Sequence, residues 1–163
     1  MCTIQNIFNA DYIFMIMKER IILRPMDFNK LKNEVKKNND KEIIFASGDD
    51  ELNRKVMEKL RVSGVLIYLG DRKDYMKQRN SGLNEVMVRI AKRNGIDIYF
   101  DINELLDSKN KERLLSRLRQ NIVLCNRLKV KIRVINDVGK NETDIGALFN
   151  SLGAPTWMVK GLF

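Results

Sequence analysis

Two groups of carboxylates are the side chains of this sequence best suited to acid–base or metal chemistry. Asp97 and Asp101 lie in a run with the alternation of a β-strand, which places them with Tyr99 on one strand face. They define a candidate polar row of an active site. The second group, residues 49–51, directly precedes an amphipathic segment, and acidic residues at that place stabilise a helix N-terminus. We therefore interpret the second group as a helix start.

The sequence lacks the other side chains that most hydrolases use. It has 163 residues, no histidine and two cysteines, Cys2 and Cys125, which are too far apart for a CxxC pair. A histidine-based nucleophile relay and a histidine-ligated metal site are therefore excluded. A metal ion held by carboxylates alone remains possible. Motifs of the GxGxxG and GxxxxGK[ST] types are absent, so we expect no nucleotide cofactor.

Length and composition predict a single globular domain over residues 1–163, with 44% hydrophobic and 31% charged residues. No apolar run approaches the ~20 residues of a membrane helix, and residues 1–17 lack the basic start of a signal peptide. Two cysteines cannot form a disulfide framework, which is typical of a reducing compartment. We therefore expect a cytoplasmic protein.

Short β-rich runs alternate with amphipathic segments along the chain. The strand candidates are residues 12–17, 20–24, 42–46, 64–69, 96–100 and 131–135. Helices are predicted to begin at Asp27, after Asp49 and at Ser81, and to cover residues 110–128 and 143–152. This order predicts an α/β fold with parallel strands, either a doubly wound open sheet or a (β/α) barrel. Six strand candidates are too few for an eight-unit barrel, so a barrel would be incomplete.

The positive charge is concentrated in two segments. The chain has 30 Lys and Arg against 21 Asp and Glu, a formal charge of +9 at pH 7. Residues 109–133 hold nine basic residues and one acidic residue, and residues 72–93 hold seven basic and two acidic residues. Helical periodicity places Arg113, Arg117 and Arg127 on the outward face of the later segment. Such a surface attracts polyanions, because binding releases counterions from phosphates.

Three other interpretations remain open at this stage. A basic helix face is often only a solvated surface, and Glu85 and Arg89 have the spacing of an ordinary i, i+4 ion pair. The cationic face would also suit an acidic protein. In a third interpretation, Asp97 and Asp101 hold a divalent metal ion in a stand-alone phosphoesterase. We favour a nucleic acid, because two basic segments stand out in an otherwise acidic chain.

A run of short motifs between positions 72 and 130 carries a family resemblance. Arg72-Lys73-Asp74 precedes Asn80-Ser81-Gly82-Leu83-Asn84-Glu85-Val86, and Asn94-Gly95-Ile96-Asp97-Ile98-Tyr99-Phe100 and Arg119-Gln120-Asn121 follow. This pattern resembles archaeal ribonuclease P protein component 3 and its eukaryotic counterpart, over about residues 21–153. The resemblance implies a (β/α) TIM-like barrel without a metal site, here shortened to about six or seven parallel strands and therefore incomplete.

The resemblance also implies a function. It predicts a subunit of the endoribonuclease that removes the 5′ leader from precursor tRNA, in which the RNA performs the chemistry and the protein has no catalytic residue. The implied partners are the ribonuclease P RNA, precursor tRNA and a small α+β protein subunit, with no membrane. Because few aromatic residues are expected at the surface, we predict recognition of RNA shape and backbone rather than base stacking.

The predicted RNA-binding residues have two origins. The family's motifs map onto Arg72, Lys73, Asn80, Ser81, Asn84, Arg119 and Asn121. The two basic segments add Arg79, Arg89, Lys92, Arg93, Arg113, Arg117, Arg127 and Lys129. Arginine binds phosphate through two parallel hydrogen bonds, while Asn and Ser reach 2′-hydroxyls and base edges.

Overall fold

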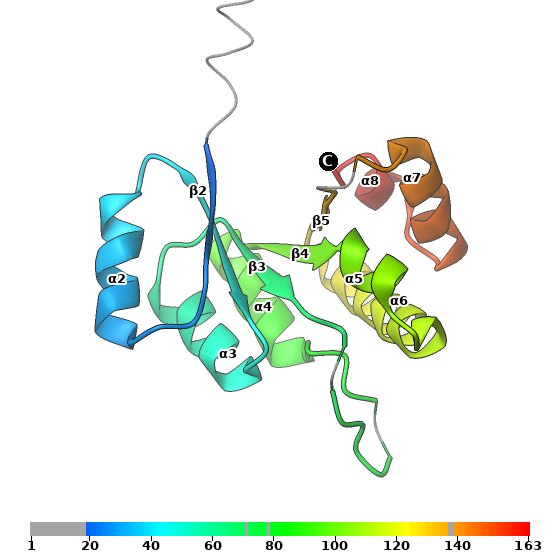
Figure 1. Cartoon of the computed structure of the whole chain (residues 1–163), viewed down its shortest axis with the longest axis horizontal. Helices are drawn as coiled ribbons and strands as arrows, with labels where there is room; N and C mark the ends of the chain where they lie inside the picture. Colours follow the sequence, from blue (N-terminus) through cyan, green and yellow to red (C-terminus); the bar gives the residue numbers. More distant parts are fainter. Residues whose placement is uncertain (1–18, 71, 78, 137–138) are drawn as a thin grey trace, which may run out of the picture.

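The computed structural model describes residues 19–70, 72–77, 79–136 and 139–163, and its framework is a parallel β-sheet (Figure 1). The described strands are β1 (Arg20–Leu23), β2 (Glu42–Ser47), β3 (Gly64–Ile67), β4 (Asp97–Asp101) and β5 (Ile132–Ile135). They lie in the order β1-β2-β3-β4-β5, and every neighbouring pair is parallel. A doubly wound sheet reverses its strand order at a switch point, whereas this order never reverses. The fold is therefore an α/β fold of the incomplete TIM-barrel type, and the strand candidate at 12–17 lies outside the described residues.

Helices follow each described strand. They are α2 (Phe28–Lys37), α3 (Asp50–Lys59), α4 (Glu85–Asn94), α5 (Ile102–Asp107), α6 (Lys111–Leu128), α7 (Glu142–Ser151) and α8 (Thr156–Val159). Asp27 and Asp49 cap α2 and α3 by accepting hydrogen bonds from the first backbone amides, as their positions in the sequence predict. The sequence did not predict α5 and α8, and α4 begins four residues later than its predicted start. No helix of the described ranges has the length and apolar content needed to cross a membrane.

The two faces of the sheet bury different sets of side chains. Ile98 and Phe100 of β4 belong to the main core. This core also contains buried residues from all seven described helices. The opposite face forms a small cluster of strand residues, among them Leu66 and Tyr99, without any helix residue. This second face corresponds to the interior of a barrel. Tyr99 thus lies opposite Ile98 and Phe100, as the alternation in the sequence predicts.

Candidate nucleic-acid interface

The connection between β3 and α4, here called the β3–α4 loop (described residues of 68–84), is irregular and is fixed by a buried arginine from α6. Arg117 is only 3% exposed. Its Nη1 donates to the Leu69 carbonyl at 2.6 Å, and its Nη2 donates to the Arg72 carbonyl at 2.7 Å and to Asp74 Oδ1 at 2.9 Å. One guanidinium group therefore satisfies acceptors at three positions of the loop.

Two further side chains fix the loop from neighbouring helices. The Asn121 carboxamide of α6 is fully buried and donates to the Ser81 carbonyl at 2.8 Å. The Glu104 carboxylate of α5 accepts hydrogen bonds from the backbone amides of Leu69 and Gly70. Because a charged acceptor strengthens an amide hydrogen bond, Glu104 holds the first residues after β3 firmly in place.

Arg72 fixes the loop from within. Its side chain is 6% exposed, and its Nη1 donates to both carboxylate oxygens of Asp50 at 2.8 Å. Its Nε also donates to the Tyr68 carbonyl. Gly82 has a φ of 79°, and a Cβ there would lie 2.6 Å from the Arg72 guanidinium carbon. Only glycine satisfies both the backbone conformation and this close approach.

These contacts correct part of the sequence prediction. Arg72, Ser81, Arg117 and Asn121 were predicted at an RNA-binding surface, but all four side chains are nine-tenths or more buried. The prediction that Arg117 faces outward on α6 is wrong, because the loop covers that part of the helix and its carbonyls accept the guanidinium donors. We describe Arg72, Glu104, Arg117 and Asn121 as anchor residues, since they position the loop from below its surface.

The remaining predicted cations are at the surface. We name them the α4–α6 cationic surface: Lys73, Arg79, Arg89, Lys92, Arg93, Arg113, Arg119, Arg127 and Lys129, all exposed. Two contacts show that α4 and α6 lie side by side. Arg127 Nη2 lies 2.6 Å from Glu85 Oε2, and Lys92 Nζ donates to the Lys129 carbonyl at 3.0 Å. The two basic segments of the sequence therefore meet on adjoining helices.

Three acidic residues of this region, Glu85, Asp74 and Asp50, are paired with arginines. Hydrogen bonding from Arg89, together with the positive charge of Arg127, lowers the pKa of Glu85 below its usual value. The Arg117 guanidinium and the Asn80 amide likewise lower the pKa of Asp74. Asp50 is held by Arg72. Glu85 and Asp74 are therefore ionised at neutral pH, and an arginine compensates each of the three carboxylates, which leaves the α4–α6 cationic surface positive.

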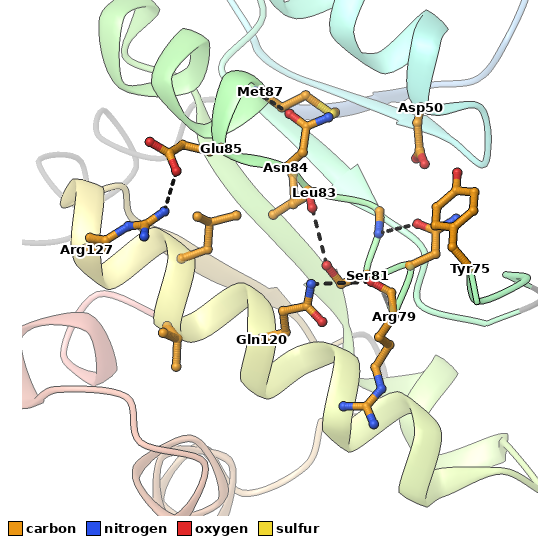
Figure 2. A pocket seen from close by; sticks show the side chains of 14 residues that line it. Asp50, Tyr75, Arg79, Ser81, Leu83, Asn84, Glu85, Met87, Gln120 and Arg127 are labelled. Carbon is orange, nitrogen blue, oxygen red and sulfur yellow. Dashed lines mark hydrogen bonds and ion pairs between the residues drawn. The ribbon is translucent and has the colours of Figure 1, made fainter. Parts of the chain in front are cut away.

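A groove of about 700 Å³ opens between the β3–α4 loop, the start of α4 and α6 (Figure 2). Tyr75 and Arg79 lie at one end, and Glu85 with Arg127 lies at the other. Asn80 and Asn84, two of the predicted residues, line it, and Asn84 also caps α4 by accepting from the Met87 amide at 2.9 Å. Sequence reasoning did not include Tyr75 and Gln120 among the binding residues. The sequence feature that could have identified Tyr75 is its position as a single aromatic residue in a cationic loop with few aliphatic residues.

The carboxylates proposed for chemistry are engaged elsewhere in the structure. Asp97 Oδ2 accepts from Arg133 Nε at 2.8 Å, and Asp101 caps α5 by accepting from the Asn103 amide. Within the described ranges, no three His, Cys, Asp or Glu side chains come close enough to hold a metal ion. Burial raises the pKa of the Cys125 thiol to about 12, so this side chain is a thiol at neutral pH and a poor nucleophile.

The fold and the groove together describe an incomplete (β/α) barrel with a positively charged surface on two neighbouring helices and the loop before them. No protein-family model and no curated protein matches the sequence. Among solved structures, a chain of the cryo-EM structure of archaeal ribonuclease P with mature tRNA is similar, with a TM-score of 0.72 and 21% sequence identity. The similarity covers 89% of this chain and 64% of that chain. The present chain thus spans less than two thirds of its neighbour, and the likeness establishes the fold.

Proposed function

We propose that this chain is an RNA-binding protein subunit of ribonuclease P. In this role it binds and stabilises the catalytic RNA during removal of the 5′ leader from precursor tRNA, and it supplies no active site of its own. The observation that carries the proposal is the α4–α6 cationic surface, which stands on a fold similar to a chain of archaeal ribonuclease P. The motif resemblance between positions 72 and 130 supports the same assignment.

The proposed partners are the ribonuclease P RNA, precursor tRNA and a small α+β protein subunit, and the proposed location is the cytoplasm. The single domain over residues 1–163 would contact RNA through exposed cations. Arg113, Arg119 and Arg79 are the most direct candidates, since they are exposed and the structure gives their side chains no ion pair within the described residues. An unpaired guanidinium can bind a phosphate without first breaking an internal contact.

The stand-alone phosphoesterase gains no support from the site. It would use Asp97 and Asp101 as metal ligands. However, the Asp97 carboxylate forms an ion pair with Arg133, and the Asp101 carboxylate accepts a hydrogen bond from the Asn103 backbone amide of α5. Catalysis through Asp97 would require loss of this ion pair. We therefore develop only the RNA-binding proposal.

Removing two charges from α6 is expected to weaken RNA binding and flatten its salt dependence. In the double variant Arg113→Gln/Arg119→Gln, the slope of log K against log salt for a precursor tRNA transcript should fall in magnitude by about 1 to 2. Each phosphate contact contributes roughly 0.7 to 0.9 to this slope. The measurement is a titration at several salt concentrations with the full-length protein.

The matched control removes the same charge from the other end of the molecule. Lys32 and Lys36 are exposed on α2, which Figure 1 shows at the opposite end of the sheet from α6. Lys32→Gln/Lys36→Gln should change the slope by less than half as much. Equal changes in the two double variants would show that net charge, and not the α4–α6 cationic surface, governs binding.

A further inference from the structure

The groove of Figure 2 has the dimensions of a small-ligand site, which binding of a phosphate backbone does not require. Its volume of about 700 Å³ lies within the range of ~300–1,000 Å³ typical of sites for drug-sized molecules. Leu83, Met87 and Val123 give it an apolar lining between polar residues. Val123 is 59% exposed, so this apolar surface is open to a ligand.

Tyr75 provides an aromatic surface at one end of the groove. The residue is 68% exposed, and Figure 2 shows its ring standing beside the groove near Asp50 and Arg79. A largely solvated aromatic ring in a cationic loop is a stacking platform for a nucleobase, because every base has a π-face. Tyr75, which is not among the RNA-binding residues predicted from the sequence, is therefore placed where a base would enter.

Carboxamides line the groove and retain hydrogen-bonding capacity. Asn84 uses Oδ1 to accept from the Met87 amide, and Asn80 uses Oδ1 to accept from the Gly82 amide at 3.1 Å. Within the described residues, the Nδ2 groups of both side chains have no acceptor, and Gln120 makes only a long contact of 3.4 Å to the Arg79 carbonyl. Asn and Gln side chains of this kind bind the edges of unpaired bases.

The charges at the groove suit a nucleotide and its neighbours in the chain. Arg79 and Arg127 lie at opposite ends, where the phosphates on either side of an inserted base would pass. The two acidic lining residues are compensated, Asp50 by Arg72 and Glu85 by Arg89 and Arg127. No unpaired carboxylate of the described lining therefore repels the nucleotide.

We propose that this groove receives one unpaired nucleotide of the bound RNA. Its base stacks on Tyr75 and is contacted by Asn80, Asn84 and Gln120, while Arg79 and Arg127 bind the flanking phosphates. This inference rests on the proposed RNA-binding function and goes beyond it, because it assigns a ligand to a defined groove and adds base recognition to backbone recognition. A fully paired RNA helix cannot fill the groove, since its bases remain stacked within the duplex.

Two RNA hairpins test this assignment. They have the same stem, and one carries a single unpaired adenosine in the middle of that stem. The full-length protein should bind the bulged hairpin about five- to hundredfold more tightly, the range expected for one base stacked on an aromatic ring. Tyr75→Phe should keep this preference because the ring remains. Tyr75→Ala should lose it without changing the salt slope, since no charge is removed.

The possible outcomes distinguish failure of the nucleotide-groove proposal from failure of the proposed RNA-binding function. Equal affinity for both hairpins, with a normal salt slope, would overturn the nucleotide groove and leave RNA binding intact. A preference that survives in Tyr75→Ala would also overturn it. No binding to either hairpin at low salt would overturn both proposals. Tyr75 is exposed, so circular dichroism should show the same fold for all three proteins.

Discussion

Replacement of Arg117 by alanine is expected to lower the free energy of unfolding by about 3 kcal/mol. The substitution removes a buried guanidinium and leaves the carbonyls of Leu69 and Arg72 without their donors. It also removes the ion-pair partner of Asp74. Breaking a buried charged contact from one side is costly, because the remaining groups stay desolvated without a partner. Urea unfolding of the two proteins measures the difference.

Arg113 is the matched control, since it lies one turn earlier on α6 and is exposed. Arg113→Ala should change the unfolding free energy by less than about 0.5 kcal/mol, as surface substitutions usually do. The two substitutions should affect RNA binding in different ways. Arg113→Ala should lower the magnitude of the slope of log K against log salt, because it removes an exposed charge. Arg117→Ala should weaken RNA binding indirectly, because it disorders the β3–α4 loop. Equal stability of the two variants would contradict the anchoring role of Arg117.

Replacement of Gly64 by alanine is expected to destabilise the protein by about 2 to 3 kcal/mol, because the barrel interior has no room for one more methyl group. A Cβ at Gly64 would lie 2.2 Å from Cε2 and 2.4 Å from Cδ2 of Tyr99. Tyr99 is 1% exposed, and its hydroxyl donates to Glu42 Oε1 at 2.7 Å. The ring therefore cannot move away without breaking this partly buried hydrogen bond. Thermal or urea unfolding measures the effect.

Gly48 supplies the control, because a Cβ there would meet nothing within 4 Å. Gly48→Ala should be neutral within about 0.5 kcal/mol. A double-mutant cycle with Tyr99→Leu identifies the cause. Once the ring is gone, adding Gly64→Ala should cost much less than it does alone. Full additivity of the two substitutions would refute a clash between Gly64 and Tyr99.

The sequence allowed prediction of the elements whose signals are local. Alternating apolar residues located all five described strands, and Asp27 and Asp49 marked helix starts because a cap acts on amides two or three residues away. α5 and α8 were missed since helices of six and four residues are too short to show periodicity. The start of α4 was misplaced because Asn84, and not Ser81, caps the helix, and Gly82 between them has a φ of 79°.

The candidate site was predictable in its charge and in two residues of the groove, Asn80 and Asn84. Clustering of basic residues is visible in the sequence, and most of those residues are exposed as predicted. The burial of Arg117 was not predictable, because its helical position resembles that of Arg113 and the difference comes from loop carbonyls 45 to 48 residues distant. Arg72 was misassigned for the same reason, since Asp50 precedes it by 22 residues. A helical wheel does not show which segment, distant in the sequence, packs over a given face of the helix.

The anchor residues link the stability of the β3–α4 loop to the arrangement of the exposed cations. Between Leu69 and Leu83, which are buried in the main core, the β3–α4 loop has little apolar content, so buried polar contacts from α5 and α6 fix its shape. The exposed cations of the loop and of both helices then stand in a fixed arrangement. A pre-ordered binding surface loses less conformational entropy when it meets a large RNA. Stability of the loop and affinity for RNA are therefore expected to be coupled.

The most direct test of the proposed function is purification of the tagged full-length protein from the cells that produce it, with and without nuclease treatment, followed by sequencing of the bound RNA. We expect strong enrichment of the ribonuclease P RNA and of precursor tRNAs with their 5′ leaders, and cleavage of added precursor tRNA by the untreated sample only. A preparation that contains no enriched RNA, or an RNA population unrelated to tRNA processing, would contradict the proposed function.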